Sequence, residues 1–195
     1  MSIPTFNDNA LPLARTPNFK LYVDVSENST ETLELQGKGV ESWTVTENEE
    51  ITKIPDVLGN VLKLRGVPKP TQTGVRLYII KGSVLAGILF NAWYTGDKSK
   101  LDSINIVQKF EIVDGQQTGY CLARREKDVM ISITDFSGEA EGYLNFVCDF
   151  HYSNERVLGE MAKTDANPPV FMTNAEVAAA LAAASTQTQG TGTPQ

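Results

Sequence analysis

Apolar and polar residues alternate in short runs along most of this chain, a period of two that is typical of β-strands with one buried face. In GVRLYII the alternation places Val75, Leu77 and Ile79 on one face. In INIVQKFEIV the expected inward residues are Ile104, Ile106, Phe110 and Ile112. In EGYLNFVCDFHY they are Leu144, Phe146, Cys148, Phe150 and Tyr152, and the outward residues are Asn145, Asp149 and His151.

Turn signals separate these runs, most clearly at VDGQQTG, REKD and DFSGEAEG. Short strands that recur with such turns between them are typical of antiparallel all-β architectures. The sequence therefore predicts a mainly β fold, an antiparallel β-sandwich or barrel.

One segment, GSVLAGILFNAWYTGD, has apolar residues at helical spacing and predicts a single α-helix among the strands. Ser83 is its expected N-cap and Gly96 its expected stop. The apolar stripe consists of Leu85, Ile88, Leu89, Ala92 and Trp93. This helix is expected to close one face or open end of the sandwich, and Gly87 and Ala92 would let a sheet approach closely.

The two ends of the chain differ from the folded body, which we place at residues 18–163. Residues 1–17 contain three prolines and no periodicity, which predicts an extended N-terminal arm. Residues 164–195 form a C-terminal tail, in which TNAEVAAALAAAS predicts a short Ala-rich helix with Thr173 or Asn174 as its N-cap. The final TQTQGTGTPQ has a composition typical of disorder.

The net charge of −7 over 195 residues disfavours tight binding of nucleic acid, which needs clustered Lys and Arg. It is compatible with a surface that nucleic acid slides past, because like charges repel.

The start of the chain lacks a secretory signal pattern, and the longest apolar run, VLAGILF, is too short to cross a bilayer. We therefore expect no membrane partner, and we interpret Cys121 and Cys148 as buried thiols in a reducing compartment.

The search for chemistry finds no catalytic, cofactor-binding or metal-binding motif in the sequence. The single histidine, His151, lies on the outward phase of a strand, and the two cysteines do not form a CxxC pair. The cluster Asp135, Glu139 and Glu141 lacks the spacing of an EF-hand and is interpreted as a solvated hairpin tip. We expect the protein not to be an enzyme, with a carboxylate site at that cluster as the alternative.

The stretch WTVTENEEITKIPDVLGN begins as a strand and continues as a long excursion without a clean period. A long loop and an extended arm cost conformational entropy that few contacts within one chain offset. Such segments are explained if a neighbouring copy orders them. The predicted contact residues between subunits or between rings are Glu47, Glu49, Glu50, Ile51, Ile54, Val57 and Leu58.

Residues 33–159 resemble the tail tube (major tail) proteins of long-tailed bacteriophages. The resemblance rests on VESWTVTENEE…DVLGN, on GVRLYIIKGSVLAGILFNAWYTGDKSKLDSINIVQKFEI, and on GYCLARREKDVMISITDFSGEAEGYLNFVCDFHYSNERVLG. These stretches carry the strand order, one helix in the corresponding place and a long early loop. Related tubes occur in contractile tails, gene-transfer particles and phage-derived bacteriocins.

The resemblance implies a virion subunit that closes into a hexameric ring, with rings stacked into a hollow tail tube that delivers the genome. The implied partners are other copies of the chain, tape measure and terminator proteins, and double-stranded DNA that passes without tight binding. Assembly in the host bacterial cytoplasm and incorporation into the virion tail follow, with no cofactor. Strand phase then predicts lumen-facing residues in an acidic conduit: Glu41, Thr44, Thr46, Asn145 and Asp149.

Two other classes of structural or binding protein fit the same strand-rich, acidic sequence. One is a different phage structural protein, a tail terminator or a capsid decoration protein. The other is a carbohydrate-binding β-sandwich module, which would be expected to carry an export signal and exposed aromatic residues on one face.

Overall fold

The computed structural model describes residues 19–26, 31–36, 44–55, 61–138, 142–164 and 168–188. This part of the chain is mainly β and antiparallel, as predicted. The strands are Phe19–Asp24 (β1), Leu33–Leu35 (β2), Val45–Thr46 (β3), Ile51–Pro55 (β4), Val61–Arg65 (β5), Thr71–Tyr78 (β6), Ile104–Asp114 (β7), Tyr120–Ser137 (β8), Asn145–His151 (β9), Glu155–Ala162 (β10) and Phe171–Thr173 (β11). The helices are Val84–Thr95 (α1) and Asn174–Thr188 (α2), with a 3₁₀ turn, η2, at Ser99–Leu101. The predicted arm, residues 1–17, and the end of the tail lie outside the described residues.

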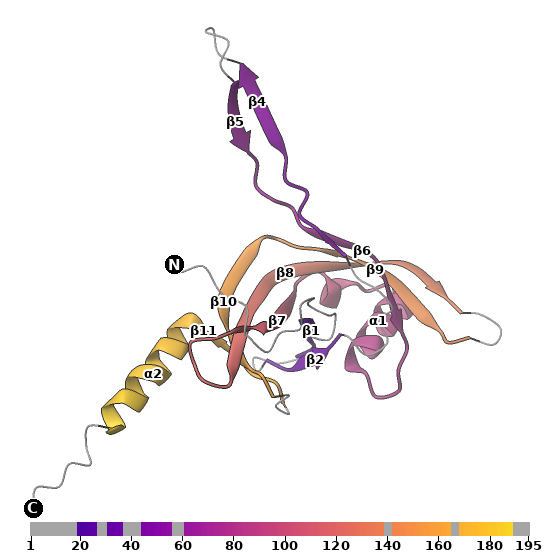
Figure 1. The fold of residues 1–195 in the computed structure, drawn as a ribbon. Helices are drawn as coiled ribbons and strands as arrows, with labels where there is room; N and C mark the ends of the chain where they lie inside the picture. Colours follow the sequence, from indigo (N-terminus) through magenta and orange to yellow (C-terminus); the bar gives the residue numbers. More distant parts are fainter. Residues whose placement is uncertain are drawn as a thin grey trace, which may run out of the picture. The chain divides into compact units, whose positions relative to one another are not determined.

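The strands form one nine-stranded sheet and one separate two-stranded sheet (Figure 1). The main path runs β2-β1-β7-β8-β9-β6-β3, with β10 paired to β8 and β11 paired to β10. The second sheet is the hairpin of β4 and β5. By its internal contacts the chain divides into two units, one made of residues 1–37, 106–125 and 156–195, the other of residues 38–105 and 126–155.

The first unit has an apolar core between its short strands and the ends of the long ones. Its buried residues come from β1, β2, β7, β8, β10 and β11: Tyr22, Leu33, Val107, Ala123, Met161 and Phe171. The guanidinium of Arg125 lies 4.4 Å from the ring centroid of Phe171 and bonds the carboxylate of Glu31 at 2.7 Å. The predicted tail therefore supplies a core residue, Phe171, which the sequence analysis did not anticipate.

Helix α2 begins with a reciprocal pair of hydrogen bonds between Thr173 and Glu176. The backbone N–H of Glu176 donates to the Thr173 hydroxyl at 3.3 Å, and the N–H of Thr173 donates to the Glu176 carboxylate at 2.7 Å. This capping box resolves the two predicted N-cap candidates in favour of Thr173. The exposed Glu176 carboxyl accordingly has a pKa below its ordinary value, because backbone and hydroxyl donors of Thr173 favour its charged form.

The second unit contains α1, whose Trp93 contacts Phe136 of β8. Ser83 accepts a hydrogen bond from the backbone N–H of Ala86 at 3.1 Å, and Gly96 ends the helix with φ 78°, as the sequence predicted. The buried residues of the helix are Leu85, Ala86, Leu89 and Ala92. Ile88 is only half-buried and Trp93 is exposed, so the buried stripe is narrower than predicted.

Three strand-phase predictions need correction. In β9, Phe146, Cys148 and Phe150 are buried as predicted, but Asn145 is also buried and Leu144 lies exposed before the strand begins. The hydroxyl of Ser137 donates to the Asn145 side-chain oxygen at 3.2 Å, which satisfies a buried polar group.

Strand β7 is buried on both faces at its centre. Gln108 and Lys109, which lie on opposite faces, are both buried. Arg124 donates to Gln108 at 2.6 Å, and the Lys109 amine lies 2.9 Å from Glu111. The predicted inward residues Phe110 and Ile112 are half-buried instead. The third correction concerns Ile79, which follows the end of β6 and is half-buried.

Two glycines provide a matched test of the packing. A Cβ at Gly159 in β10 would clash with the backbone carbonyl of Met172 in the paired strand β11, whereas a Cβ at Gly87 would meet nothing within 4 Å. Gly87 is exposed on α1, so the predicted close approach of a sheet at this glycine was wrong.

We expect Gly159→Ala to destabilise the protein by about 3 kcal/mol or more, because backbone must move to admit the methyl group. Gly87→Ala should stabilise it by about 1 kcal/mol through helix propensity. Urea unfolding followed by circular dichroism measures both. Equal unfolding midpoints for the two variants would contradict the close β10–β11 packing.

Candidate assembly interface

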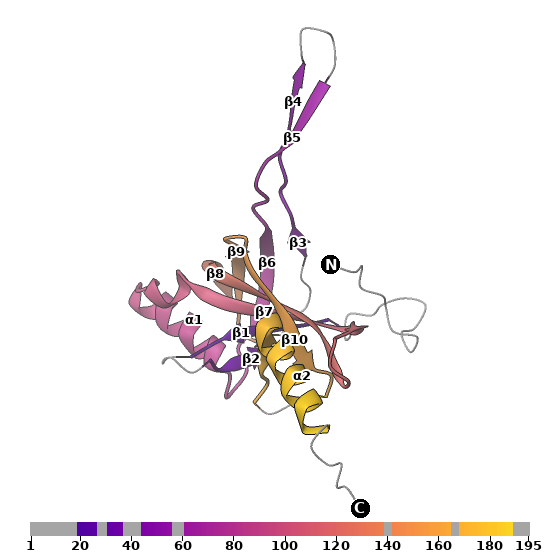
Figure 2. The same cartoon turned by 90° about the vertical axis from the view of Figure 1, so that its left-hand side faces the viewer.

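The hairpin of β4 and β5 is the most exposed element in the described part of the chain. The two strands pair only with each other, in the register Ile51↔Arg65, Lys53↔Lys63 and Pro55↔Val61. Every residue of β4 is exposed, and Figure 2 shows the hairpin extending away from β3 and β6, the strands before and after it in the same unit. An isolated two-stranded sheet is marginally stable in water. This element therefore lacks the packing that usually stabilises a sheet.

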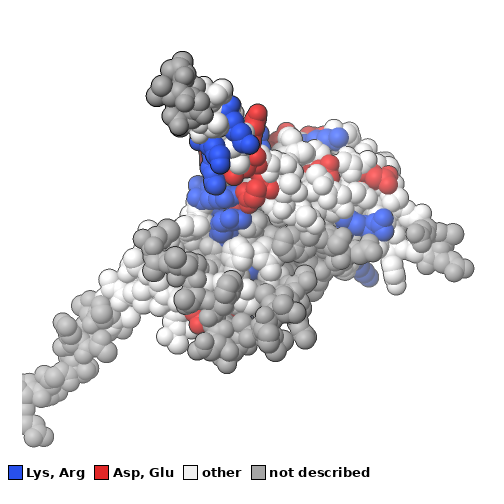
Figure 3. Space-filling view, turned by 45° about the horizontal axis from the view of Figure 1, so that its top comes forward, with Lys and Arg blue, Asp and Glu red and all other residues white. Residues whose placement is uncertain are grey.

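The two faces of the hairpin differ in chemistry. Cross-strand partners share a face, so one face carries Lys53, Lys63 and Arg65 beside Ile51, Pro55 and Val61. The opposite face carries Thr52, Ile54 and Leu64, of which Ile54 and Leu64 are each 46% exposed. Basic side chains gather on the hairpin in the space-filling view, with acidic side chains at its base (Figure 3).

The base of the hairpin is fixed by hydrogen bonds between its two stems. Asn48, with φ 47°, donates its side-chain amide to the Thr71 hydroxyl at 2.9 Å and to the Lys69 carbonyl at 3.2 Å. The N–H of Gly66 donates to the Glu50 carbonyl at 2.7 Å, which extends the pairing of β4 and β5 toward the sheet. A left-handed Asn is a common solution where a strand must turn. These bonds set the direction in which the hairpin leaves β3 and β6.

A second exposed apolar surface lies on α1. Phe90 and Tyr94 stack with centroids 6.0 Å apart and an interplanar angle of 8°, and Tyr94 is 75% exposed. Trp93 contacts Phe136 at 4.4 Å, and Phe136 contacts the buried Phe146 at 4.8 Å. The aromatic contacts thus continue from the core of this unit to its surface. Figure 2 shows α1 from another side.

Five of the seven predicted contact residues lie in the described part of the chain, and all five are exposed: Glu47, Glu49, Glu50, Ile51 and Ile54. Val57 and Leu58 lie outside the described residues. The expectation of an irregular excursion was wrong, because residues 51–55 form a strand that pairs with β5. Glu49 is also partnered within the chain, with Arg65 at 3.6 Å.

The predicted lumen residues separate into distinct groups. Thr44 and Thr46 are exposed on either side of the half-buried Val45, as the alternation indicated. Asn145 is buried and cannot line a channel, and Glu41 lies outside the described residues. Asp149 is half-buried, and its carboxylate accepts a hydrogen bond at 2.7 Å from the N–H of Gly74, which has φ 66° at the β6 bulge.

The residues considered for chemistry do not converge on a catalytic arrangement. Within the described residues no group of three or more His, Cys, Asp or Glu side chains could hold a metal ion. Asp135 is exposed in β8, and Glu139 and Glu141 lie outside the described part. Burial raises the pKa of Cys121 to about 11 and that of Cys148 to about 12, so both thiols stay protonated and unreactive at neutral pH. His151 is half-buried in β9.

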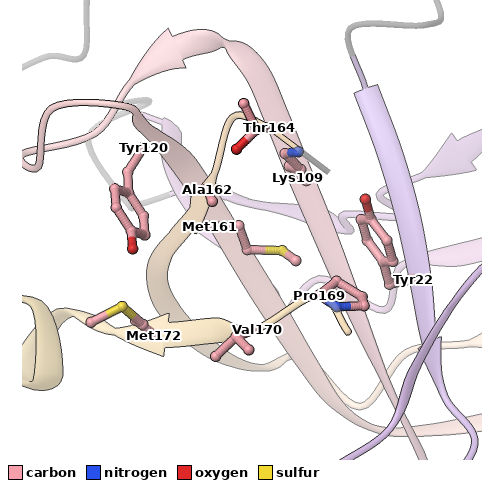
Figure 4. A pocket seen from close by; sticks show the side chains of 9 residues that line it. All are labelled: Tyr22, Lys109, Tyr120, Met161, Ala162, Thr164, Pro169, Val170 and Met172. Atoms are coloured by element: carbon pink, nitrogen blue, oxygen red, sulfur yellow. The ribbon is translucent and has the colours of Figure 1, made fainter. Parts of the chain in front are cut away.

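A cavity of about 290 Å³ lies in the first unit (Figure 4). It is lined by Tyr22, Lys109, Tyr120, Met161, Ala162, Thr164, Pro169, Val170 and Met172. The Lys109 amine is bonded to Glu111 and to the Lys163 carbonyl at 3.1 Å. Its charge is therefore already compensated, and the remaining lining is largely apolar. This cavity offers packing space and no acid–base pair.

None of the described helices is long and apolar enough to span a membrane.

The sequence analysis missed the second strand of the hairpin and the residues it carries. Val61, Lys63, Leu64 and Arg65 come to share the faces of β4 only through the antiparallel register. The signal that could have found them is the alternation of apolar and basic residues in VLKLR after the turn residues Gly59 and Asn60.

No protein-family model and no curated protein matches the chain. Among solved structures it is similar to the sheath/tube terminator of an extracellular contractile injection system, PVC, with a TM-score of 0.50 and 14% identity over 77% of this chain and 98% of that chain. A chain of the PVC sheath-tube complex matches with a TM-score of 0.46 and 13% identity, over 77% of this chain and 92% of that chain. The tube-terminating cap of the anti-feeding prophage matches with a TM-score of 0.45 and 11% identity, over 78% and 95%. The first likeness shows a shared fold.

The bond from Gly74 to Asp149 gives a test of whether this carboxylate has a role in folding. We expect Asp149→Ala to lower the free energy of unfolding by about 1 kcal/mol, because the Gly74 N–H loses its acceptor. Asp149→Asn keeps an acceptor oxygen and should stay near the wild type. Chemical denaturation compares the three proteins, and equal stability of Asp149→Ala and wild type would show that the bond contributes nothing.

Proposed function

We propose that the protein is a structural subunit of a tail-type particle, whose copies form a ring that ends or builds a hollow tube. The observation that carries this proposal is the fold shared with the PVC sheath/tube terminator, which is matched over 98% of its length. The alternation of buried and exposed residues in β6 and β9, which was predicted from strand phase, is compatible with such a β subunit.

The exposed hairpin supports assembly as the role of this fold. Ile51, Ile54, Val61 and Leu64 are each 46% or more exposed, which costs free energy in a monomer that leaves them in water. Exposed apolar surface of this kind marks interaction sites in soluble proteins. The hairpin residues predicted as contacts between rings remain our proposed contacts, with Val61 and Leu64 added.

Of the two ring roles, we favour a ring at the end of the tube, since the structure that shares the fold is itself a terminator. The second candidate is the tube subunit, stacked in hexameric rings as the sequence resemblance implies. The long hairpin favours this candidate, because a subunit that stacks on both sides needs a contact that reaches the next ring.

In both roles the subunit lines a conduit and catalyses no reaction. Thr44 and Thr46 are the described residues that we propose to face the lumen, together with Asp149, and the chain's charge of −7 would limit adhesion of DNA. The proposed partners are other copies of the chain and other tail proteins. The proposed location is the tail of a virion or of a related extracellular particle.

Negative-stain electron microscopy of the purified protein across a concentration series tests the proposal. Rings of uniform diameter are expected for a terminator, and long hollow tubes for a tube subunit. Analytical ultracentrifugation gives the matching mass. A compact monomer at every concentration, also in the presence of purified tube ends, would contradict an assembly role.

The apolar face of the hairpin should be needed for assembly and dispensable for folding. We expect Ile54→Ser with Leu64→Ser to reduce assembly by about tenfold or more, because two apolar contacts are lost at each interface. Circular dichroism and the unfolding midpoint should stay at wild-type values, since neither side chain packs in the core. Val84→Ser with Val170→Ser is the matched control at two exposed valines outside the hairpin. Equal loss of assembly in both double variants would count against a specific role for this face.

A further inference from the structure

The charges on the hairpin are arranged in a way that a single chain does not satisfy. Lys53 lies directly opposite Lys63 in the register of β4 and β5, and like charges facing each other across two strands are destabilising. Neither lysine has an ion-pair partner in the described part of the chain. A surface that keeps two facing lysines on a marginal two-stranded sheet is suited to an external acidic partner.

Among the described residues, the acidic side chains that precede β4 do not pair with the two lysines. Glu49 shares the face of Lys53, but four residues of extended strand separate them by about 13 Å. That carboxylate lies instead beside Arg65, at 3.6 Å. Lys53 and Lys63 therefore lie farther along the hairpin than Glu47 and Glu50, which lie at its foot. All four side chains are exposed. Glu47 has an interaction of its own within the chain. The backbone carbonyl of Glu50 accepts the hydrogen bond from the Gly66 N–H.

Charge complementarity identifies the partner class. Residues 51–70 contain four of the 17 basic residues and one of the 24 acidic residues, so this segment is opposite in sign to the chain's net charge of −7. A second copy of the chain is thus attracted to the hairpin and repelled elsewhere. Figure 3 shows the two signs on neighbouring parts of the projecting element, blue along it and red at its base.

We propose that Lys53 and Lys63 of one copy form ion pairs with the carboxylates of Glu47 and Glu50, at the foot of a neighbouring copy's hairpin. This inference rests on the proposed assembly function and adds to it the residues that set the register between copies. The face with Ile54 and Leu64 supplies the buried apolar area. The face with Lys53 and Lys63 selects the part of the neighbouring hairpin that is contacted. Electrostatic pairs of this kind determine specificity and association rate more than buried area does.

A charge-swap experiment tests the pairing. Lys53→Glu with Lys63→Glu, and separately Glu47→Lys with Glu50→Lys, should each reduce assembly by about tenfold or more at low salt. The quadruple variant has the wild-type net charge of −7 and complementary sites again, and it should recover assembly. An equimolar mixture of the two double variants should assemble more than either double variant does alone. Light scattering and electron microscopy provide the readouts, and circular dichroism verifies the fold of each variant.

Two controls separate specific pairing from a change in overall charge. Lys81→Glu with Lys98→Glu alters the net charge equally at exposed sites outside the hairpin and should assemble like wild type. Lys53→Arg with Lys63→Arg keeps the positive charges and should also assemble. Wild-type assembly should weaken between about 0.05 M and about 0.5 M NaCl, because screening shortens the reach of charge.

The outcomes distinguish failure of this inference from failure of the proposed function. If wild type assembles and the quadruple variant does not, Glu47 and Glu50 are not the partners of Lys53 and Lys63. The inference is then wrong, while the assembly function stands. If wild type stays monomeric in every condition, both are wrong. Retention of wild type on immobilised DNA, lost in Lys53→Glu with Lys63→Glu while assembly is unchanged, would assign the basic face to nucleic acid and overturn the inference.

Discussion

Strand β8 is the element on which the rest of the fold depends, because three other strands take their register from it. Its 18 residues pair with β7, β9 and β10. Cys121 and Ala123 are buried in the first unit, and Val129 and Ile131 are buried in the second. Between these segments the chain passes through Asp128, whose φ of 49° is unusual in a strand.

That irregular point is held by two side-chain bonds from other elements. The Ser103 hydroxyl donates to the Asp128 carboxylate at 2.5 Å, and the Ser153 hydroxyl donates to the Lys127 carbonyl at 2.7 Å. A short polar side chain tolerates the left-handed region better than a branched or bulky one. The mixed-charge sequence REKD was interpreted as a turn between two strands. It is instead the irregular middle of one long strand, because hydrogen bonds from outside β8 stabilise the local conformation that would otherwise end it.

The sequence predicted those parts of the fold in which one face is buried and the other is in water. Strands β6 and β9 and helix α1 follow that rule, so alternation, Ser83 and Gly96 were sufficient to define them. The rule failed where both faces are covered, as at Lys109 in β7, and where neither is, as in β4. Strand β4 is exposed on both faces and has no half-buried signature, so the periodic signal of the hairpin lies in VLKLR of β5.

The candidate interface was predictable only in its first strand for the same reason. Glu47 to Ile54 were selected because the segment lacked an evident partner within the chain, and that reasoning did not require a structure. Lys63 and Arg65 became relevant only once the register placed them beside Lys53 and Ile51. Asp149 shows another limit, since strand phase indicated an outward residue but did not indicate that its carboxylate accepts a hydrogen bond from Gly74 at the bulge.

In the proposed assembly, the net charge of −7 and the opposite charge of the hairpin would together oppose indiscriminate association of copies. Two copies that approach through other surfaces repel each other within a Debye length of about 8 Å at physiological ionic strength. In the proposed assembly, an approach that brings the basic residues of one hairpin to the acidic residues of another changes repulsion into attraction. The exposed Ile54 and Leu64 are then buried after the charges have selected the orientation. In this proposed sequence of events the hairpin can remain apolar on one face, because long-range repulsion protects that face until the correct partner is aligned.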